Sequence, residues 1–182
     1  STQIGNGSAQ TWSVNTASNA TYTVKAKNDL NLCTLDMTGS AKVFVGPKTT
    51  IAAITGVCAG SPVAVPVTVT SFEGVGYIAL TINYNPAVLQ YTGFTKNSGL
   101  MSNFGVSVLT PGLIKVVGYI QGAELPITLT AGSVLFTPSF TYLGGTTALA
   151  FDDTDAAWCQ YGSGSPYFVD FCDTPTATYY VN

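Results

Sequence analysis

The stretch SPVAVPVTVTSFEGVGYIALTINYNPAVLQYTG, residues 61–93, decides the fold of this 182-residue chain. It contains two runs in which a large apolar side chain occupies every second position. These positions are Val63, Val65, Val67 and Val69 in the first run, and Ile78, Leu80, Ile82 and Tyr84 in the second. A period of two in sequence rich in Val, Ile, Thr and Tyr is typical of β-strands with one buried face. We therefore predict two strands, joined by a turn at residues 71–76 whose two glycines can adopt positive φ.

The pattern continues beyond the second run. Asn85 and Pro86 end that run, because proline has no N–H to donate to a neighbouring strand. Apolar alternation then resumes, and further strands are predicted at 106–109, 113–120 and 132–137, followed by two strands joined by a hairpin turn at Gly144-Gly145. About eight or nine strands with this spacing, and no helix of useful length, predict an all-β sandwich.

The same stretch resembles the opening of a cohesin-like module of large secreted bacterial surface and scaffold proteins. The matching residues are Pro66, Val67, Val69, Leu80, Ile82, Tyr84, Asn85, Pro86, Leu89, Tyr91 and Gly93. Residues 132–140 and 148–151 are similar to the closing strands of the family, so the resemblance covers about residues 50–182. It implies a jelly-roll sandwich of about nine strands. The family usually has Asp before the proline, and we expect Asn85 to set a turn there rather than to contact a partner.

Residues 1–47 differ from the rest and are similar to the last three strands of an immunoglobulin-like or PKD-like module. We predict strands at 20–27, 33–37 and 40–45, and two domains, a partial immunoglobulin-like segment at 1–47 and a cohesin-like sandwich at 48–182. Three strands do not easily close a two-layer core. Either this segment packs on the second module or another chain completes it by strand addition, which would propagate into a filament. The chain also has the character of a window cut from a longer multi-module protein.

Composition excludes several classes of function. Only 8% of residues are charged, the formal net charge is −3, and the chain has no His. All six basic residues are lysines, so no basic patch for nucleic acid can form, and no apolar stretch is long enough for a membrane helix. Sites of the Ser-His-Asp or Cys-His type are impossible, and nothing in the spacing brings Glu73 and Glu124 together as a glycosidase pair. We predict that the protein is not an enzyme and that it is secreted or displayed at a cell surface.

Four cysteines suggest disulfide bonds, and sequence spacing leaves all three connectivities open. A local bridge between Cys159 and Cys172 is one possibility. The resemblance to cohesin-like modules implies a Cys58–Cys159 pair, with Cys33 and Cys172 left to pair together or with outside partners. The alternative is that some cysteines stay free as small buried apolar residues.

Two clusters are candidate binding sites. Asp152, Asp153 and Asp155 form the densest group of carboxylates and could hold Ca²⁺ through hard oxygen ligands; the alternative is an Asx-turn with solvated charges. The aromatic residues Trp158, Tyr161 and Tyr167 could stack on sugars; the alternative is that they fill the core.

These observations together predict a non-catalytic extracellular structural or adhesion module, a filament or scaffold subunit that assembles by strand addition. Its partners would be another protein or other copies of itself. The alternatives are a carbohydrate-binding module that takes polysaccharide, and a cohesin that binds a dockerin. We predict no nucleic-acid partner, no membrane span, and no cofactor other than the calcium considered above.

Overall fold

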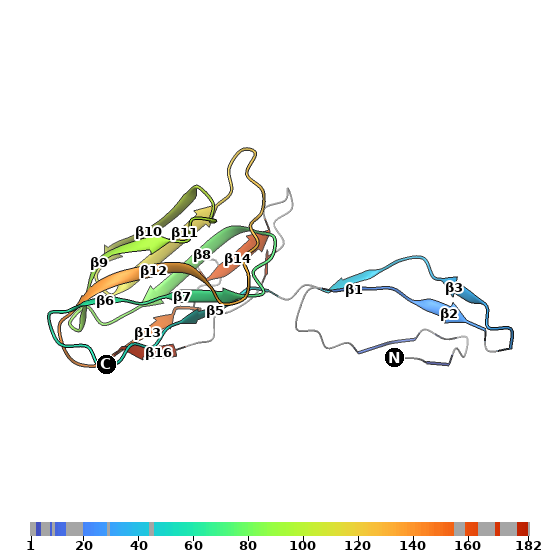
Figure 1. The fold of residues 1–182 in the computed structure, drawn as a ribbon, viewed down its shortest axis with the longest axis horizontal. Coiled ribbons are helices and arrows are strands. Elements are labelled where there is room, and N and C mark those ends of the chain that lie inside the picture. Colours follow the sequence, from blue (N-terminus) through green and yellow to red (C-terminus); the bar gives the residue numbers. More distant parts are fainter. Residues whose placement is uncertain are drawn as a thin grey trace. The chain divides into compact units, whose positions relative to one another are not determined.

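The computed structural model describes residues 3–4, 8, 10–13, 20–28, 30–43, 46–154, 159–163, 170–171 and 178–181. The chain divides into two compact units, Ser1–Val45 and Gly46–Asn182. All regular elements in the described part are β-strands, as Figure 1 shows, which confirms the predicted all-β class. No helix in that part could cross a membrane.

The second unit contains a seven-stranded sheet in which β8 is central. The strands run in the order β10-β11-β8-β13-β16, while β14 also pairs with β8, and β15 pairs with β14. Their bounds are β8 Val75–Asn83, β10 Asn103–Thr110, β11 Leu113–Tyr119, β13 Thr147–Phe151, β14 Gln160–Ser163, β15 Asp170–Phe171 and β16 Thr178–Val181. All its pairings are antiparallel.

A five-stranded sheet forms the other layer, with β12 at its centre. It has the order β5-β7-β12-β6, and β9 pairs with the opposite edge of β12. Its strands are β5 Lys48–Ile51, β6 Pro62–Ala64, β7 Val67–Thr70, β9 Leu89–Lys96 and β12 Ser133–Tyr142. The predicted sandwich is therefore present. It has more strands than expected, in part because Pro66 divides the first predicted run into β6 and β7.

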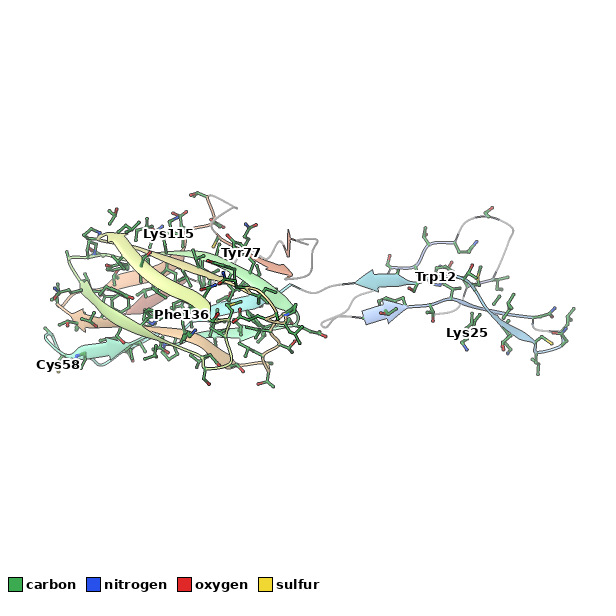
Figure 2. The ribbon with its side chains drawn as sticks, turned by 90° about the horizontal axis from the view of Figure 1, so that it is seen from above. Trp12, Lys25, Cys58, Tyr77, Lys115 and Phe136 are labelled. Atoms are coloured by element: carbon green, nitrogen blue, oxygen red, sulfur yellow. The ribbon has the colours of Figure 1, made fainter. Side chains whose placement is uncertain are left out.

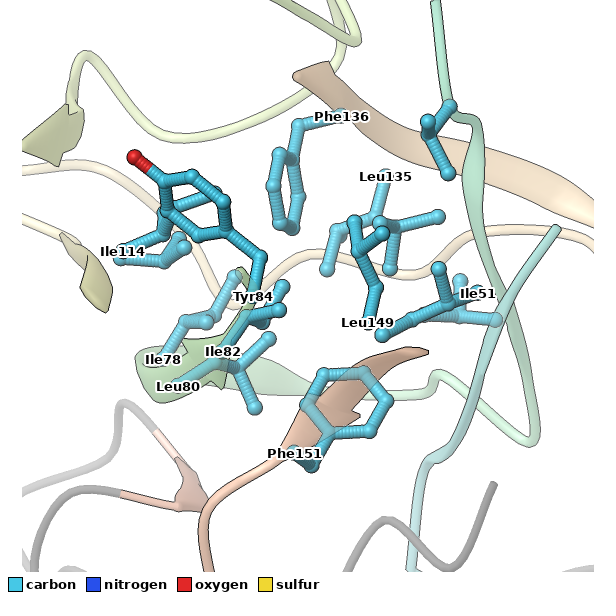
Figure 3. Packing of buried hydrophobic residues seen from close by; sticks show 14 of the residues in the cluster. Ile51, Ile78, Leu80, Ile82, Tyr84, Ile114, Leu135, Phe136, Leu149 and Phe151 are labelled. Atoms are coloured by element: carbon cyan, nitrogen blue, oxygen red, sulfur yellow. The ribbon is translucent and has the colours of Figure 1, made fainter. Parts of the chain in front are cut away.

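The core lies between the two sheets (Figure 3). Ile78, Leu80 and Ile82 of β8 point inward and are completely buried, as their alternation in the sequence predicts. Val67 and Phe136 meet them from the five-stranded sheet and are also completely buried. Burial of each such side chain contributes roughly 1.5–3 kcal/mol. This core fixes which side chains of each sheet remain on the outside.

One polar contact crosses the core. The hydroxyls of Thr49 on β5 and Tyr161 on β14 lie 2.5 Å apart, and both side chains are almost completely buried. The Tyr161 ring also packs edge-on against Phe72, with ring centroids 5.6 Å apart. Because β5 and β14 belong to different sheets, this hydrogen bond ties the two layers together.

Two connections between strands were predicted from the sequence, and one of these predictions is wrong while the other is confirmed. Gly144 and Gly145, both at positive φ, do not form a hairpin turn, because β12 before them and β13 after them lie in different sheets. The expected hairpin is a crossover between layers. Asn85 does set a turn, as predicted: its side-chain oxygen accepts the backbone N–H of Ala87 at 3.0 Å.

The first unit does not confirm the immunoglobulin-like assignment. Its strands are β1 Ala20–Tyr22, β2 Lys25–Lys27, β3 Thr34–Asp36 and β4 Ala41–Val43. Strand β1 pairs with β4 and β2 pairs with β3, so residues 20–43 form one irregular hairpin. We call this segment the hairpin. None of residues 20–28 and 30–41 is buried.

Candidate functional site

The outer side of the seven-stranded sheet presents a nearly uncharged surface. Strand alternation places Tyr77, Ala79 and Thr81 of β8 outward, opposite Tyr119, Val117 and Lys115 of β11. Gly105 and Ser107 of β10 continue two of these rows. We call these eight residues the outer face. Figure 2 labels Tyr77 and Lys115 from this set. Small side chains fill its middle, where Ala79 is 0% exposed and Thr81 is 2% exposed, and the two tyrosines lie together at one end.

The other end of the outer face is polar. The Lys115 ammonium donates to the Thr81 hydroxyl at 3.0 Å. Nearby, Asp152 accepts hydrogen bonds from the hydroxyl of Thr154 at 2.6 Å and from its backbone N–H at 3.2 Å. Hydrogen bonds from the Thr154 and Asn83 side chains, with a smaller effect of the Lys115 charge, hold the pKa of Asp152 below its ordinary value. The Asp152 carboxylate beside this end of the face therefore stays ionised at neutral pH.

Strand β10 forms one free edge of the same sheet. Within the described chain its only strand partner is β11. Its eight residues, NFGVSVLT, include no charged residue and no proline. An edge strand carries unpaired N–H and C=O groups, and natural proteins usually protect such strands with lysine, proline or a covering segment. Strand β10 lacks the first two protections, and its ladder with β11 has one bulge, between Ser107 and Thr110.

The hairpin of the first unit is amphipathic. Ala26 pairs with Leu35, and the N–H of Met37 donates to the carbonyl of Val24, so these four side chains share one side of the ladder. Leu35 is 69% exposed and Met37 is 53% exposed. On the opposite side, Lys25 and Asp36 form an ion pair of 3.0 Å. We call the four apolar residues the apolar face of the hairpin.

A carboxylate fixes the loops next to the outer face. The two oxygens of Glu124 accept the backbone N–H groups of Ser102 at 3.0 Å and Gln121 at 2.9 Å. Hydrogen bonding, first from the Ser102 side chain and then from these N–H groups, holds the pKa of Glu124 below its ordinary value. Glu124 therefore has a structural role that the sequence did not predict.

The predicted Cys58–Cys159 disulfide is not formed, since both cysteines are free, as is Cys33. Cys58 is exposed in the turn before β6, at one end of the module in Figure 2, whereas Cys159 is buried beside β14 in the other sheet. Burial raises the pKa of the Cys159 thiol. Cys172 lies outside the described residues.

The candidate sugar site is corrected at Tyr161. This side chain is completely buried and bonded to Thr49, so it cannot stack on a sugar at the surface. Its inward position agrees with the alternative that these aromatic residues fill the core. Trp158 and Tyr167 lie outside the described residues, and their part in sugar binding stays a prediction.

The candidate calcium site is only partly described. Asp152 and Asp153 lie after β13, and the bonds of Asp152 to Thr154 match the Asx-turn alternative. Asp155 lies outside the described residues. The described residues contain no group of three or more potential metal ligands, and calcium binding stays a prediction.

Comparison with known proteins identifies the second unit. A family model of the cohesin domain matches residues 47–153, which is more than half of the chain. The fold is similar to that of CaCohA2 from Clostridium acetobutylicum, solved in complex with a variant of CaDoc0917, with a TM-score of 0.62 and 21% identity over 74% of this chain and 97% of that one. It is also similar to the sixth cohesin of scaffoldin B from Acetivibrio cellulolyticus, solved in complex with a variant of the Cel5 dockerin, with a TM-score of 0.59 and 21% identity over 75% and 98%.

A third similar structure is a non-cellulosomal cohesin from the archaeon Archaeoglobus fulgidus, with a TM-score of 0.50 and 18% identity over 75% of this chain and 91% of that one. A comparison with curated protein sequences gives no match. At these identities the solved structures establish the fold, and the family model establishes the relationship. The chain therefore belongs to the cohesin family, whose domains are non-enzymatic protein-binding modules.

Proposed function

We propose that this chain is a structural module of an extracellular assembly, that it has no catalytic activity of its own, and that it acts by binding other copies of itself. One observation carries the proposal: the hairpin presents an apolar face that no described part of the first unit covers. A two-stranded hairpin is only marginally stable by itself, and it needs further strands or a packing partner. An exposed apolar surface on a protein usually marks an interaction site.

Extracellular location is part of the proposal. The low content of charged residues, 8%, is typical of secreted β-rich proteins, and membership in the cohesin family supports the same location. The three described cysteines are free, so disulfide bonds give no support here.

Sedimentation velocity of the full chain over a wide range of concentration tests the proposal. We expect assemblies that grow with concentration, and their loss when Leu35→Ser and Met37→Ser remove the apolar face of the hairpin. Thr34→Ala, on the polar side of the same ladder, is the matched control and should assemble like the unchanged chain. A chain that remains monomeric at every concentration would contradict the proposal.

A second candidate is binding of a dockerin through the outer face. Two similar structures are cohesins in complex with dockerins. Aromatic residues on a weakly charged surface are common binding anchors, and Tyr77 and Tyr119 lie directly opposite each other. Calorimetric titration with the two dockerins of those complexes tests this candidate. Heat of binding that Tyr119→Ala abolishes and Tyr91→Phe, on the other sheet, preserves would support it.

A further inference from the structure

We propose that the free edge of β10 accepts the hairpin of a second copy, so that copies join head to tail by extending the seven-stranded sheet. This inference rests on the proposed self-assembly and adds the donor segment and the acceptor strand.

Protection differs among the edges of the sandwich. In the five-stranded sheet, the edge strands β5 and β9 each carry a lysine, Lys48 and Lys96. In the seven-stranded sheet, β16 is only four residues long, whereas β10 has eight residues and no charge. A long, uncharged edge strand is the feature that natural proteins avoid unless another strand pairs with it. Strand β10 is therefore the best acceptor in the described part of the sandwich.

The two sides of β10 match the two sides of the hairpin. Val106 and Val108 of β10 are half-buried and pack against the rim of the core, while the residues between them are exposed. A strand added beside β10 must place apolar side chains on the core side and polar ones on the outer side. The hairpin meets this requirement, because Val24 and Leu35 lie on one side and the Lys25–Asp36 pair on the other.

Length and hydrogen bonding also agree. The arm of the hairpin that contains β1 and β2 spans residues 20–27, the same eight-residue length as β10. Both edges of a two-stranded ladder have unpaired N–H and C=O groups, so the hairpin can donate a strand without breaking its own pairing. Main-chain hydrogen bonds would supply affinity, and alternate side chains would set the register.

Charge favours head-to-tail contact over symmetric pairing. Residues 1–45 contain three lysines and two aspartates, a net charge of +1, whereas residues 46–182 contain three lysines and seven acidic residues, a net charge of −4. Contact between the first unit of one copy and the second unit of another joins opposite charges. Pairing of like units joins like charges, which disfavours a symmetric dimer. A heterologous contact that does not close forms an open filament.

Hydrogen–deuterium exchange of the full chain, at concentrations below and above assembly, tests the acceptor directly. We expect the amides of β10 to exchange at least about tenfold more slowly in the assembled state, because their free N–H groups become paired. Slower exchange at β5 or β9 with no change at β10 would overturn the inference, although the assembly itself would still support the proposed function. A monomer at all concentrations would overturn both.

A pair of charge variants gives a second readout. Val108→Lys places an ammonium on the core side of β10, where an added strand would bury it, and should raise the concentration for half-assembly at least about tenfold. Leu109→Lys adds the same charge to the adjacent position, which is 89% exposed, and should change this concentration much less. Circular dichroism shows whether each variant is folded. Equal effects of the two folded variants would contradict strand addition at β10.

Discussion

Removal of the Tyr161 hydroxyl tests how much the hydrogen bond between the two sheets contributes to the free energy of unfolding. In Tyr161→Phe the ring and its edge contact with Phe72 remain, while the hydroxyl of Thr49, a residue that is 2% exposed, loses its hydrogen-bond partner across the core. A buried polar group left without a partner costs about 1–3 kcal/mol. We therefore expect Tyr161→Phe to lower the free energy of unfolding by about 2 kcal/mol.

A second substitution, at Thr49, should restore the stability that Tyr161→Phe removes. Thr49→Val, made in the Tyr161→Phe background, removes the unpaired hydroxyl and keeps the shape of the side chain. Replacement of both partners by apolar groups is nearly neutral, so the double variant should regain most of the lost stability. Thr49→Val alone completes the cycle and gives the coupling energy of the pair.

Urea unfolding, followed by near-ultraviolet circular dichroism, measures these changes. With a slope of roughly 2 kcal/mol per molar urea, a loss of about 2 kcal/mol lowers the midpoint by about 1 M. The slope should not change, because the surface exposed on unfolding is the same. If Thr49→Val lowers the stability of the Tyr161→Phe variant further, the unpaired Thr49 hydroxyl is not the cause of the lost stability, and the reasoning is refuted.

Three further predictions follow from single sites. Gly118→Ala should lower stability by about 1–3 kcal/mol in thermal unfolding, because the new Cβ would lie 2.8 Å from the Phe104 ring. Folding lowers the pKa of the Glu124 carboxyl, so the carboxylate stabilises the fold fully at pH values above its ordinary pKa. This stabilisation is lost as the pH falls through the pKa of the folded state. Glu124→Gln should therefore make the urea midpoint fall less steeply at acid pH. Peptide mapping after brief alkylation should show native Cys58 modified and Cys159 protected until unfolding.

The sequence predicted the layers of the sandwich well because alternation is a local signal. Every second residue of β8 must enter the core, and Ile78, Leu80 and Ile82 show this directly in the sequence. The connections were harder to predict. Gly144-Gly145 has the composition of a hairpin turn, but glycines at positive φ also allow a chain to cross between sheets, and only tertiary packing distinguishes the two.

The candidate sites were predicted less well than the fold, and for a related reason. An aromatic residue in a strand points either into the core or into solvent, and the choice at Tyr161 depends on register, which the sequence does not state. The Cys58–Cys159 pair depended on where each cysteine lies in the fold, one exposed and one buried, which spacing along the chain does not determine. The absence of charge in residues 103–110 was visible in the sequence, but it has meaning only once β10 is known to be an edge strand.

Strand β10 contributes to two surfaces at once, and this has a consequence for the two proposed modes of binding. Its residues Gly105 and Ser107 belong to the outer face, whereas its unpaired backbone groups form the free edge. A partner on the face would contact side chains perpendicular to the sheet, and a strand at the edge would use hydrogen bonds within the plane of the sheet. The two contacts do not use the same atoms. A module that is joined to its neighbours through β10 would therefore still present Tyr77 and Tyr119 to a second protein, and assembly would widen the sheet that carries them.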